Sequence, residues 1–362
     1  MEKTPPYYGS YLQLEKVLDA QAPLSFAPGQ SPAHDEMLFI VIHQAFELWF
    51  KQILFELDYI LSVFQQKKID DDGEDLNLVR HRLRRINTIF TLLNQQVGVL
   101  DTMTPMDFLA FRNLLTPSSG FQSKQFRLIE ARLGLEMPQR HHGEYYKRTN
   151  EGGFNPQDFQ TISQTENEQH LLSCINDWLE RMPFFQASFW GNPQIEKEID
   201  HPFWQQFRSI YVAGLTEREA GKAADFDRIF FGIPTAHDSA STGTNKFSAT
   251  ALRAALFIML YRDFPVFQTS FQILDALIET DHLMSQWRQR HLSMVRRMIG
   301  FRVGTGNTSG AGYLEGALQQ HEVYTDLAGL STFLIVRSAL PNLPDALKKA
   351  LGFRLADLSF PG

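Results

Sequence analysis

The sequence predicts an all-α protein, and three observations support that fold class. Apolar residues recur at intervals of three and four over long stretches, which is the period of an amphipathic helix. Helix start signals and glycine or proline breaks separate these stretches. We find no convincing alternation of polar and apolar residues that would mark strands, and no internal repeat.

Three long helices are predicted from this period. The second and third run from Glu74 to about Val97 and from Thr269 to Gly300, where the pattern is most regular. The first runs from Asp35 to about Gln65 and would be roughly 45 Å long at about 1.5 Å per residue, as expected for a core helix of a bundle. Its apolar face consists of Phe39, Phe46, Phe50, Ile53, Leu57 and Ile60.

Shorter helices are predicted between and after the long ones. Residues 104–107 (TPMD) combine a capping hydroxyl, a proline at the first helical position and an acid three residues after the cap. A short helix should begin there and carry Phe108, Phe111 and Arg112. Further helices are expected at about 125–133, 166–190, 194–213 and 248–261. A pair of helices is expected across 313–340, followed by a small C-terminal helix.

Two polar stretches, 138–160 and 232–247, lack a helical period and are predicted to be loop insertions. The length of 362 residues allows one large domain or two ordinary ones. The 30 phenylalanines indicate aromatic packing or an aromatic-lined cavity.

Composition narrows the range of partners. A formal charge of −7 and a pI near 5.9 argue against nucleic acid or an anionic membrane as the main partner. Cys174 is the single cysteine, which excludes an internal disulfide and a cysteine-based metal site within one chain and favours a reducing, cytoplasmic location. The N-terminus has no apolar signal core, and charged residues interrupt the most apolar stretch, 37–64, so we expect neither secretion nor a membrane span.

Two histidines are candidate ligands because each interrupts an apolar stripe at helical spacing. His43 lies between Phe39 and Phe46, and His291 lies between Trp287 and Met294. A buried imidazole needs a partner for its nitrogens, and an axial bond to haem iron is one such partner. A core histidine that is hydrogen-bonded to backbone or water is the ordinary alternative for each.

Other kinds of site are less well supported. The sequence has no HExxH motif, and the glycine-rich stretch 300–312 lacks both the lysine of a P-loop and the glycine pattern of a dinucleotide site. Small residues there would still let backbone approach a ligand closely, with Thr305 offering a hydroxyl, although a plain turn between helices is equally compatible. Arg112, on an aromatic helix face, could clamp a carboxylate or simply reach water.

Taken together, several segments resemble the tryptophan 2,3-dioxygenase family. These are YGSYL from Tyr8, HDEMLFIVIHQAFELWFKQILFEL from His34, LDTMTPMDFLAFRNLLTPSSGFQSKQFRLIE from Leu100, YRDFPVFQTSFQILDALIETDHLMSQWRQRH ending at His291, and MIGFRVGTGNTSGAGYL from Met298. The resemblance extends from about residue 7 to 340 in the order of the family, and the two polar loops match least. It implies one haem-binding domain over 1–362, in which a helical bundle encloses one b-type haem per subunit.

The resemblance also implies roles for individual residues. His291 would be the proximal ligand of the haem iron, and His43 would be the distal, catalytic histidine beside the substrate indole N–H. Phe39 and Phe108 would form walls of the indole pocket, with Leu115 nearby. Some members of the family have tyrosine where Phe108 stands, so a hydroxyl contact to the substrate carboxylate would be missing here.

The remaining implied contacts involve the polar end of the substrate and a second subunit. Arg112 would bind the substrate carboxylate, and Thr305 would contact the ammonium group together with a haem propionate. Tyr8 and Tyr11 would reach the site of a neighbouring subunit, so the N-terminal segment 1–30 would pack on that subunit within a homotetramer.

The implied reaction inserts both atoms of O2 across the indole C2–C3 bond of L-tryptophan. Its product is N-formyl-L-kynurenine, the first intermediate of the kynurenine pathway of tryptophan catabolism. A related haem monooxygenase acting on a tryptophan or tyrosine derivative would share His291, and a haem gas sensor would need no carboxylate clamp. A purely structural helical bundle would bind no haem.

Overall fold

The computed structural model describes residues 5–66, 68–71, 73–135, 153–191, 198–233, 245–300, 302, 304 and 322–352. All regular elements in these ranges are helices, and the ranges contain no β-strand. The predicted all-α fold is therefore confirmed.

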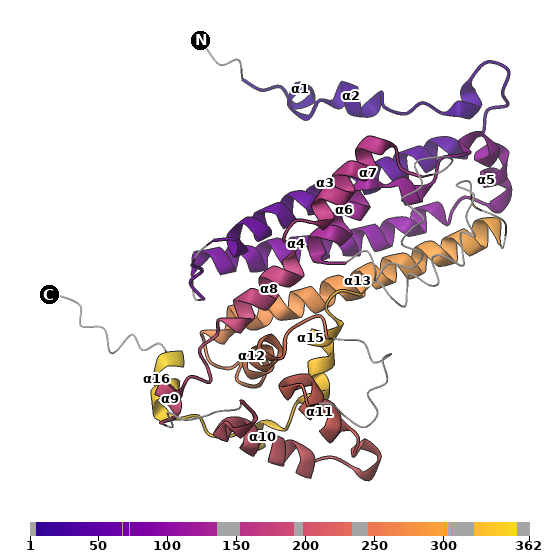
Figure 1. The fold of residues 1–362 in the computed structure, drawn as a ribbon. Helices are drawn as coiled ribbons and strands as arrows, with labels where there is room; N and C mark the ends of the chain where they lie inside the picture. Colours follow the sequence, from indigo (N-terminus) through magenta and orange to yellow (C-terminus); the bar gives the residue numbers. More distant parts are fainter. Residues whose placement is uncertain are drawn as a thin grey trace.

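Three long helices run side by side and form the body of the molecule (Figure 1). They are α3 (Asp35–Phe64), α4 (Glu74–Leu100) and α13 (Phe267–Ile299). α4 packs along both others, and the shorter α6 (Lys124–Leu133) packs on α3. The apolar period places one face of each helix inward, and each such side chain stabilises the fold by about 1.5–3 kcal/mol when fully buried. Fully buried examples are Ile53, Leu57, Ile60, Leu83, Ile86 and Leu277.

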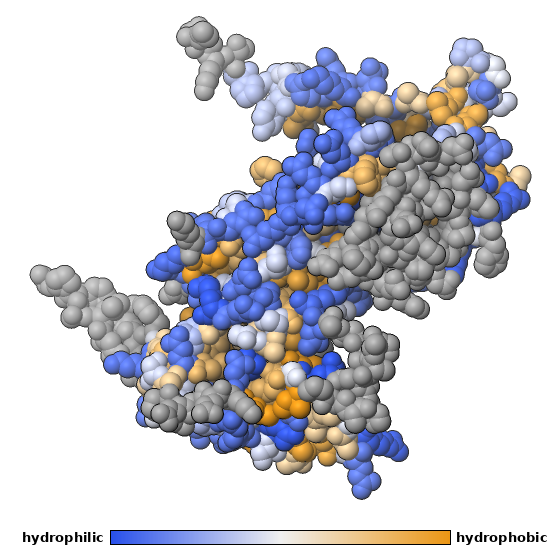
Figure 2. Space-filling model, in the orientation of Figure 1, coloured by the Kyte–Doolittle hydropathy of each residue, from blue (hydrophilic) through white to orange (hydrophobic). Residues whose placement is uncertain are grey.

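Shorter helices gather at one end of this bundle (Figure 1). They are α8 (Leu171–Glu180), α9 (Ala187–Trp190), α10 (Pro202–Ala213), α11 (Lys222–Phe231), α12 (Ala249–Leu260), α15 (Thr325–Gly329) and α16 (Asp345–Leu351). Aromatic rings fill the space between several of them: the Trp204 ring stacks on Phe230 at a centroid distance of 5.8 Å. On the face drawn in Figure 2, mainly hydrophilic side chains cover the long helices, and hydrophobic ones are visible among the shorter helices.

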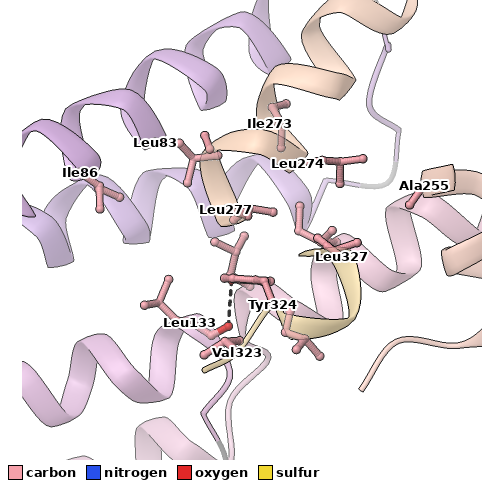
Figure 3. Packing of buried hydrophobic residues seen from close by; sticks show 14 of the residues in the cluster. Leu83, Ile86, Leu133, Ala255, Ile273, Leu274, Leu277, Val323, Tyr324 and Leu327 are labelled. Carbon is pink, nitrogen blue, oxygen red and sulfur yellow. Dashed lines mark hydrogen bonds between the residues drawn. The ribbon is translucent and has the colours of Figure 1, made fainter. Parts of the chain in front are cut away.

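Tyr324 joins the two groups of helices into one core (Figure 3). Its ring is fully buried, and its hydroxyl donates a hydrogen bond of 3.1 Å to the carbonyl of Leu133 at the end of α6. Leu83 from α4, Leu277 from α13 and Leu327 from α15 surround it in the same cluster. The segment that follows residue 321 is thereby fixed to the long helices.

The N-terminal segment runs outside the bundle (Figure 1). α1 (Tyr8–Leu12) and α2 (Leu14–Leu18) contain no buried residue. Firm attachment begins where the carboxylate of Glu36 accepts hydrogen bonds from the backbone N–H groups of Leu24, at 2.7 Å, and Ser25, at 2.8 Å. Just before this point, Gln44 on α3 accepts a 2.6 Å hydrogen bond from the side chain of Gln21 and donates one of 2.9 Å to the carbonyl of Ala20.

Among the described residues, α3 alone has the length and apolar composition of a membrane-spanning helix. Core helices of soluble proteins have the same properties, so composition does not separate the two cases. One face of α3 is buried against α4 and α6.

The loop predicted over 138–160 is wrong at its C-terminal end, because α7 (Pro156–Glu166) begins inside it. The side chain of Asn155 caps this helix by accepting a 2.8 Å hydrogen bond from the N–H of Asp158, and proline occupies the first helical position. Residues 136–152 lie outside the described part of the chain, as do residues 234–244 of the second predicted insertion, 232–247.

Three other helix predictions need correction. The single helix expected at 166–190 is divided into α8 and α9, because Pro183 has no N–H to donate in a continuous helix. α10 begins at Pro202 rather than near 194, with the His201 imidazole accepting from a backbone N–H at its start. Where the chain is described within 313–340, it contains the short α15 and two 3₁₀ turns, Leu330–Phe333 and Arg337–Ala339.

Candidate active site

A cavity of about 440 Å³ lies between α3, α5 (Pro105–Phe111), α6 and α13. Small-molecule sites usually enclose about 300–1,000 Å³, so the cavity can hold a ligand of moderate size. Its lining is mostly apolar and aromatic, with a few charged groups. The predicted site residues that line it are Phe39, His43, Phe108, Arg112 and His291.

His43 presents one defined nitrogen as a hydrogen-bond acceptor. Its Nδ1 lies 2.7 Å from the carbonyl oxygen of Phe39, one turn earlier on α3. Because a carbonyl can only accept, Nδ1 carries the proton and Nε2 keeps its lone pair. Burial lowers the pKa of His43, an effect that the Phe39 carbonyl and the Glu47 carboxylate oppose. His43 is therefore neutral at pH 7.

His291 lies on α13 and is also neutral. Burial, and secondarily the nearby His43, lower its pKa to about 4. A row of rings connects the two histidines: His43 contacts Phe46 at 6.0 Å between centroids, Phe46 contacts Trp287 at 6.2 Å, and Trp287 contacts His291 at 5.5 Å. The imidazole of His291 thus offers a lone pair to the cavity in an aromatic setting.

The described residues contain no group of three or more histidine, cysteine, aspartate or glutamate side chains that could hold a metal ion. A single neutral imidazole is too few protein ligands for a bare ion such as zinc, which normally needs three or four. One imidazole is sufficient for a metal that a macrocycle already holds, as in haem proteins. The donor set at this cavity therefore fits a haem iron better than a free metal ion.

The aromatic wall and the guanidinium come from one short element. The hydroxyl of Thr104 and the carboxylate of Asp107 form the predicted capping box that starts α5. α5 places Phe108 against Phe39, with ring centroids 5.9 Å apart, and Arg112 begins the 3₁₀ turn that follows. A positive charge is thus held beside an apolar wall at one part of the cavity.

A polar junction between α3 and α6 contributes Glu47 and Ser123 to the cavity lining. The hydroxyl of Ser123 donates a 2.5 Å hydrogen bond to Glu47, one turn after His43, and also accepts from the N–H of Phe126 to cap α6. The amide of Gln125 donates to the same carboxylate at 2.8 Å. These residues carry no signal in the sequence, because their contacts join segments far apart in the chain.

The structure does not bring all predicted site residues to the cavity. Leu115 ends the 3₁₀ turn and packs against the hydrophobic core instead of lining the cavity. Tyr8 and Tyr11 are 71% and 75% exposed on α1 and lie outside the cavity lining of their own chain. Thr305 is outside the described residues, although the neighbouring Gly304 lines the cavity.

Comparison with known proteins gives one consistent result. The sequence profile of the family described as tryptophan 2,3-dioxygenase matches residues 1–334. The chain is 39% identical to a tryptophan 2,3-dioxygenase of Bdellovibrio bacteriovorus, over 98% of this chain and 99% of the relative. It is 39% identical to that of Rattus norvegicus, over 95% of this chain and 86% of the relative, and 40% identical to tryptophan 2,3-dioxygenase B of Danio rerio, over 94% and 85%. Identity at this level along nearly the whole chain, together with the fold and the cavity, establishes that the chain belongs to the tryptophan 2,3-dioxygenase family.

Proposed function

We propose that this chain is a haem-dependent dioxygenase that cleaves the indole C2–C3 bond of L-tryptophan with O2 to give N-formyl-L-kynurenine. The observation that carries the proposal is one apolar cavity faced by two neutral histidines and by Arg112. Both oxygen atoms enter the product, so the reaction consumes no external electrons. The family membership and the names of the relatives support the same reaction.

His291 would hold the cofactor, haem b with one group per chain, through its neutral imidazole. The lining is mostly apolar and aromatic, and the lowered pKa keeps the ligating nitrogen unprotonated at neutral pH. Haem, when bound, supplies the iron at which O2 is activated. The protein groups around it bind and orient the other reactant.

The substrate is an apolar indole with a zwitterionic tail, and the cavity offers matching groups. Phe39 and Phe108 would form walls for the indole ring. Arg112 would bind the carboxylate through charge-assisted hydrogen bonds, which guanidinium makes in a bidentate fork. Fixing both ends of the molecule aims C2 and C3 of the indole at the reacting oxygen, which lowers the entropic part of the barrier. The contact of Thr305 with the ammonium group remains a prediction.

His43 would orient the indole by accepting its N–H at Nε2. We expect His43→Ala to retain haem while lowering kcat/KM for L-tryptophan, and to improve the relative use of 1-methyltryptophan, which has no N–H and needs extra space. Loss of one hydrogen bond to a neutral partner costs about 1 kcal/mol, so the fall in kcat/KM should be about 5-fold or more. Steady-state kinetics with both substrates measure this, and an unchanged ratio between them would contradict the role.

The pH profile provides a control for this assignment. Among the described residues, the other titratable or charged groups that line the cavity are Glu47, Arg112, Arg127, Glu130, Arg288 and His291. Because burial lowers the pKa of His43 below its usual 6.5, protonation should remove the acceptor only on the acid side of neutrality. kcat/KM should therefore stay level around pH 7 and fall as the pH drops below 6.5. In His43→Ala, the part of this decrease that comes from protonation of His43 should be absent.

One experiment tests the proposed function as a whole. The purified full chain is loaded with haem, reduced, and mixed with L-tryptophan and ¹⁸O2, and the product is analysed by mass spectrometry. N-Formylkynurenine with two labelled oxygen atoms supports the proposal. One labelled atom would indicate a monooxygenase, and a change in the haem spectrum without product would indicate a sensor; either result overturns it.

The quaternary structure expected for the family, a homotetramer, forms part of the proposal. Its support is the exposed N-terminal segment, where Tyr8 and Tyr11 have no partner surface within their own chain that buries them. Such a segment could complete the site of a neighbouring subunit. The single cysteine, Cys174, is buried and unbridged, which agrees with the expected cytoplasmic location.

Complementation between subunits tests this arrangement. One chain carries Tyr8→Ala and Tyr11→Ala, and the other carries His291→Ala, so each is defective in a different part of the shared site. Co-expressed and purified as a mixed assembly, they should have more activity than either variant alone, because intact tyrosines reach an intact haem site. Activity no greater than the sum of the two separate variants would contradict sharing, and sedimentation velocity checks that both variants assemble normally.

A further inference from the structure

A buried histidine starts α10, in the group of shorter helices and outside the cavity lining. His201 is 3% exposed, and its Nδ1 accepts a 3.2 Å hydrogen bond from the backbone N–H of Phe203. This bond caps the helix, a role that asparagine, aspartate or serine usually fills. Because Nδ1 accepts, the neutral ring carries its one proton on Nε2.

The surroundings of this ring are aromatic. Phe185 and Trp190 contact it edge to face, with ring centroids 5.4 Å and 4.7 Å away. The Nε1 atom of Trp190 donates a 2.8 Å hydrogen bond to the carbonyl of Phe184, which fixes the indole ring. The Nε2 atom of His201 is buried and has no hydrogen-bond partner among the described residues. His201 therefore joins the start of α10 to residues 184–190 through a neutral, buried ring.

A second proton on this ring would have to bind Nδ1, to which the N–H of Phe203 already points. Two donors would then face each other and the cap would be lost, because an imidazolium ring has no lone pair with which to accept. The new positive charge would also lie where burial removes its hydration. Protonation of His201 and the closed arrangement of the start of α10 therefore oppose each other.

Burial, rather than a charged neighbour, controls the protonation of His201. Burial lowers its pKa to about 4, and the backbone of Phe185 opposes this only in part. Residues 183–191 include no charged side chain, and Glu198 pairs with Arg253 of α12. The other charged residues on the described elements around the ring are Asp200, Arg208, Asp345, Lys348 and Lys349. Because an exposed imidazole titrates near 6.5, the closed arrangement loses stability as the pH falls from 6.5 toward 4 and is unaffected at higher pH.

We propose that His201 is an acid-sensitive latch whose protonation releases the start of α10 from residues 184–190. Trp204 and Phe207 are fully buried and hold the rest of the helix in the aromatic core. Among the described residues that line the cavity, none belongs to 184–190 or to α10, so the long helices stay closed when the latch opens. Acid thus loosens one end of the molecule first, independently of the proposed function.

Hydrogen–deuterium exchange followed by mass spectrometry tests the latch on the purified full chain. The reporting amides are those of Phe203 and Gln205, which donate to the ring and to the backbone carbonyl of His201. Each exchange rate is divided by the intrinsic rate of an unfolded peptide at the same pH. Protection of these amides should fall about 10-fold or more between about pH 7 and about pH 5, while that of α3 and α13 should change much less.

Two variants separate titration from the capping bond. His201→Asn keeps a capping oxygen that does not titrate, so protection at neutral pH should be kept and the decrease on the acid side should be absent. His201→Gln has a side chain closer in length to the imidazole and should also remove the decrease. His170→Asn is the matched control: His170 caps α8 in the same way, with Nδ1 3.2 Å from the N–H of Ser173, but is only partly buried. The acid response of α10 should persist in this control.

Three results would overturn the inference. One is an equal loss of protection in α3, α13 and α10, which would indicate unfolding of the whole chain. Another is level protection of Phe203 and Gln205 down to about pH 5 in the unaltered protein. The third is an acid decrease that persists in both His201 variants, which would assign it to another group. The first two are measured on the unaltered protein, so a variant that fails to fold does not prevent a decision.

Discussion

His291→Ala should lose its haem and, with it, all measurable dioxygenase activity. The variant removes the one imidazole that faces the cavity from α13, and the nearby rings of Trp287 and Phe46 have no lone pair to replace it. Partners in the outer shell of a metal site are worth about 10- to 100-fold in affinity, so loss of the axial ligand should exceed that range. The ratio of haem absorbance to protein absorbance after purification measures it.

His43→Ala serves as the matched control, since it removes an imidazole from the opposite helix of the same cavity and should keep haem. A second variant, His291→Gly, separates loss of the ligand from misfolding: added imidazole should restore haem binding and its spectrum. Normal haem content and activity in His291→Ala would refute the axial assignment.

Arg112→Met should lower kcat/KM for L-tryptophan by about 10- to 100-fold. The expected loss follows from the 1.5–3 kcal/mol that a hydrogen bond to a charged group contributes, at about 1.4 kcal/mol per factor of ten. Methionine keeps much of the apolar stem of Arg112, which lines the same cavity as Phe108, so the change acts mainly on charge. Steady-state kinetics on haem-loaded protein measure the effect.

Tryptamine, which lacks the carboxylate, tests whether Arg112 recognises that group of the substrate. The unaltered protein should prefer L-tryptophan strongly, and Arg112→Met should lose most of this preference because its activity on tryptamine changes little. Arg112→Lys should recover part of it, since lysine keeps the charge but not the bidentate geometry. An unchanged preference in Arg112→Met would move carboxylate recognition to another residue.

The sequence was sufficient to predict the long helices, because their stability depends on a local period. α3, α4 and α13 begin and end within about three residues of the predicted limits. The capping box at Thr104 was equally predictable, since its two hydrogen bonds join residues three apart. Segments with mixed polarity were less predictable: α7 is largely polar, and only its Asn155 cap and Pro156 indicate where it begins.

The candidate site likewise contains residues that the sequence predicts and residues that it does not. His43 and His291 were predicted because each interrupts an apolar stripe, which a single helix reveals. Glu130 had no such signal: a glutamate on a helix usually faces water, and its burial depends on Arg288, 158 positions away in the sequence. The resemblance to the family supplied the roles of Phe39 and Phe108, and for Arg112 it decided between the carboxylate clamp and the contact with water that the helix face left open.

The hydrogen bond that orients His43 has a consequence for how new substrate ranges can arise in this scaffold. The acceptor for Nδ1 is the main-chain carbonyl of Phe39, whereas the pocket wall is the side chain of the same residue. Replacing Phe39 by a smaller or larger residue changes the shape of the pocket and leaves the tautomer of the imidazole intact. Substitution at this one position can therefore alter selectivity for the ring of the substrate while the hydrogen bond that sets the imidazole tautomer is kept.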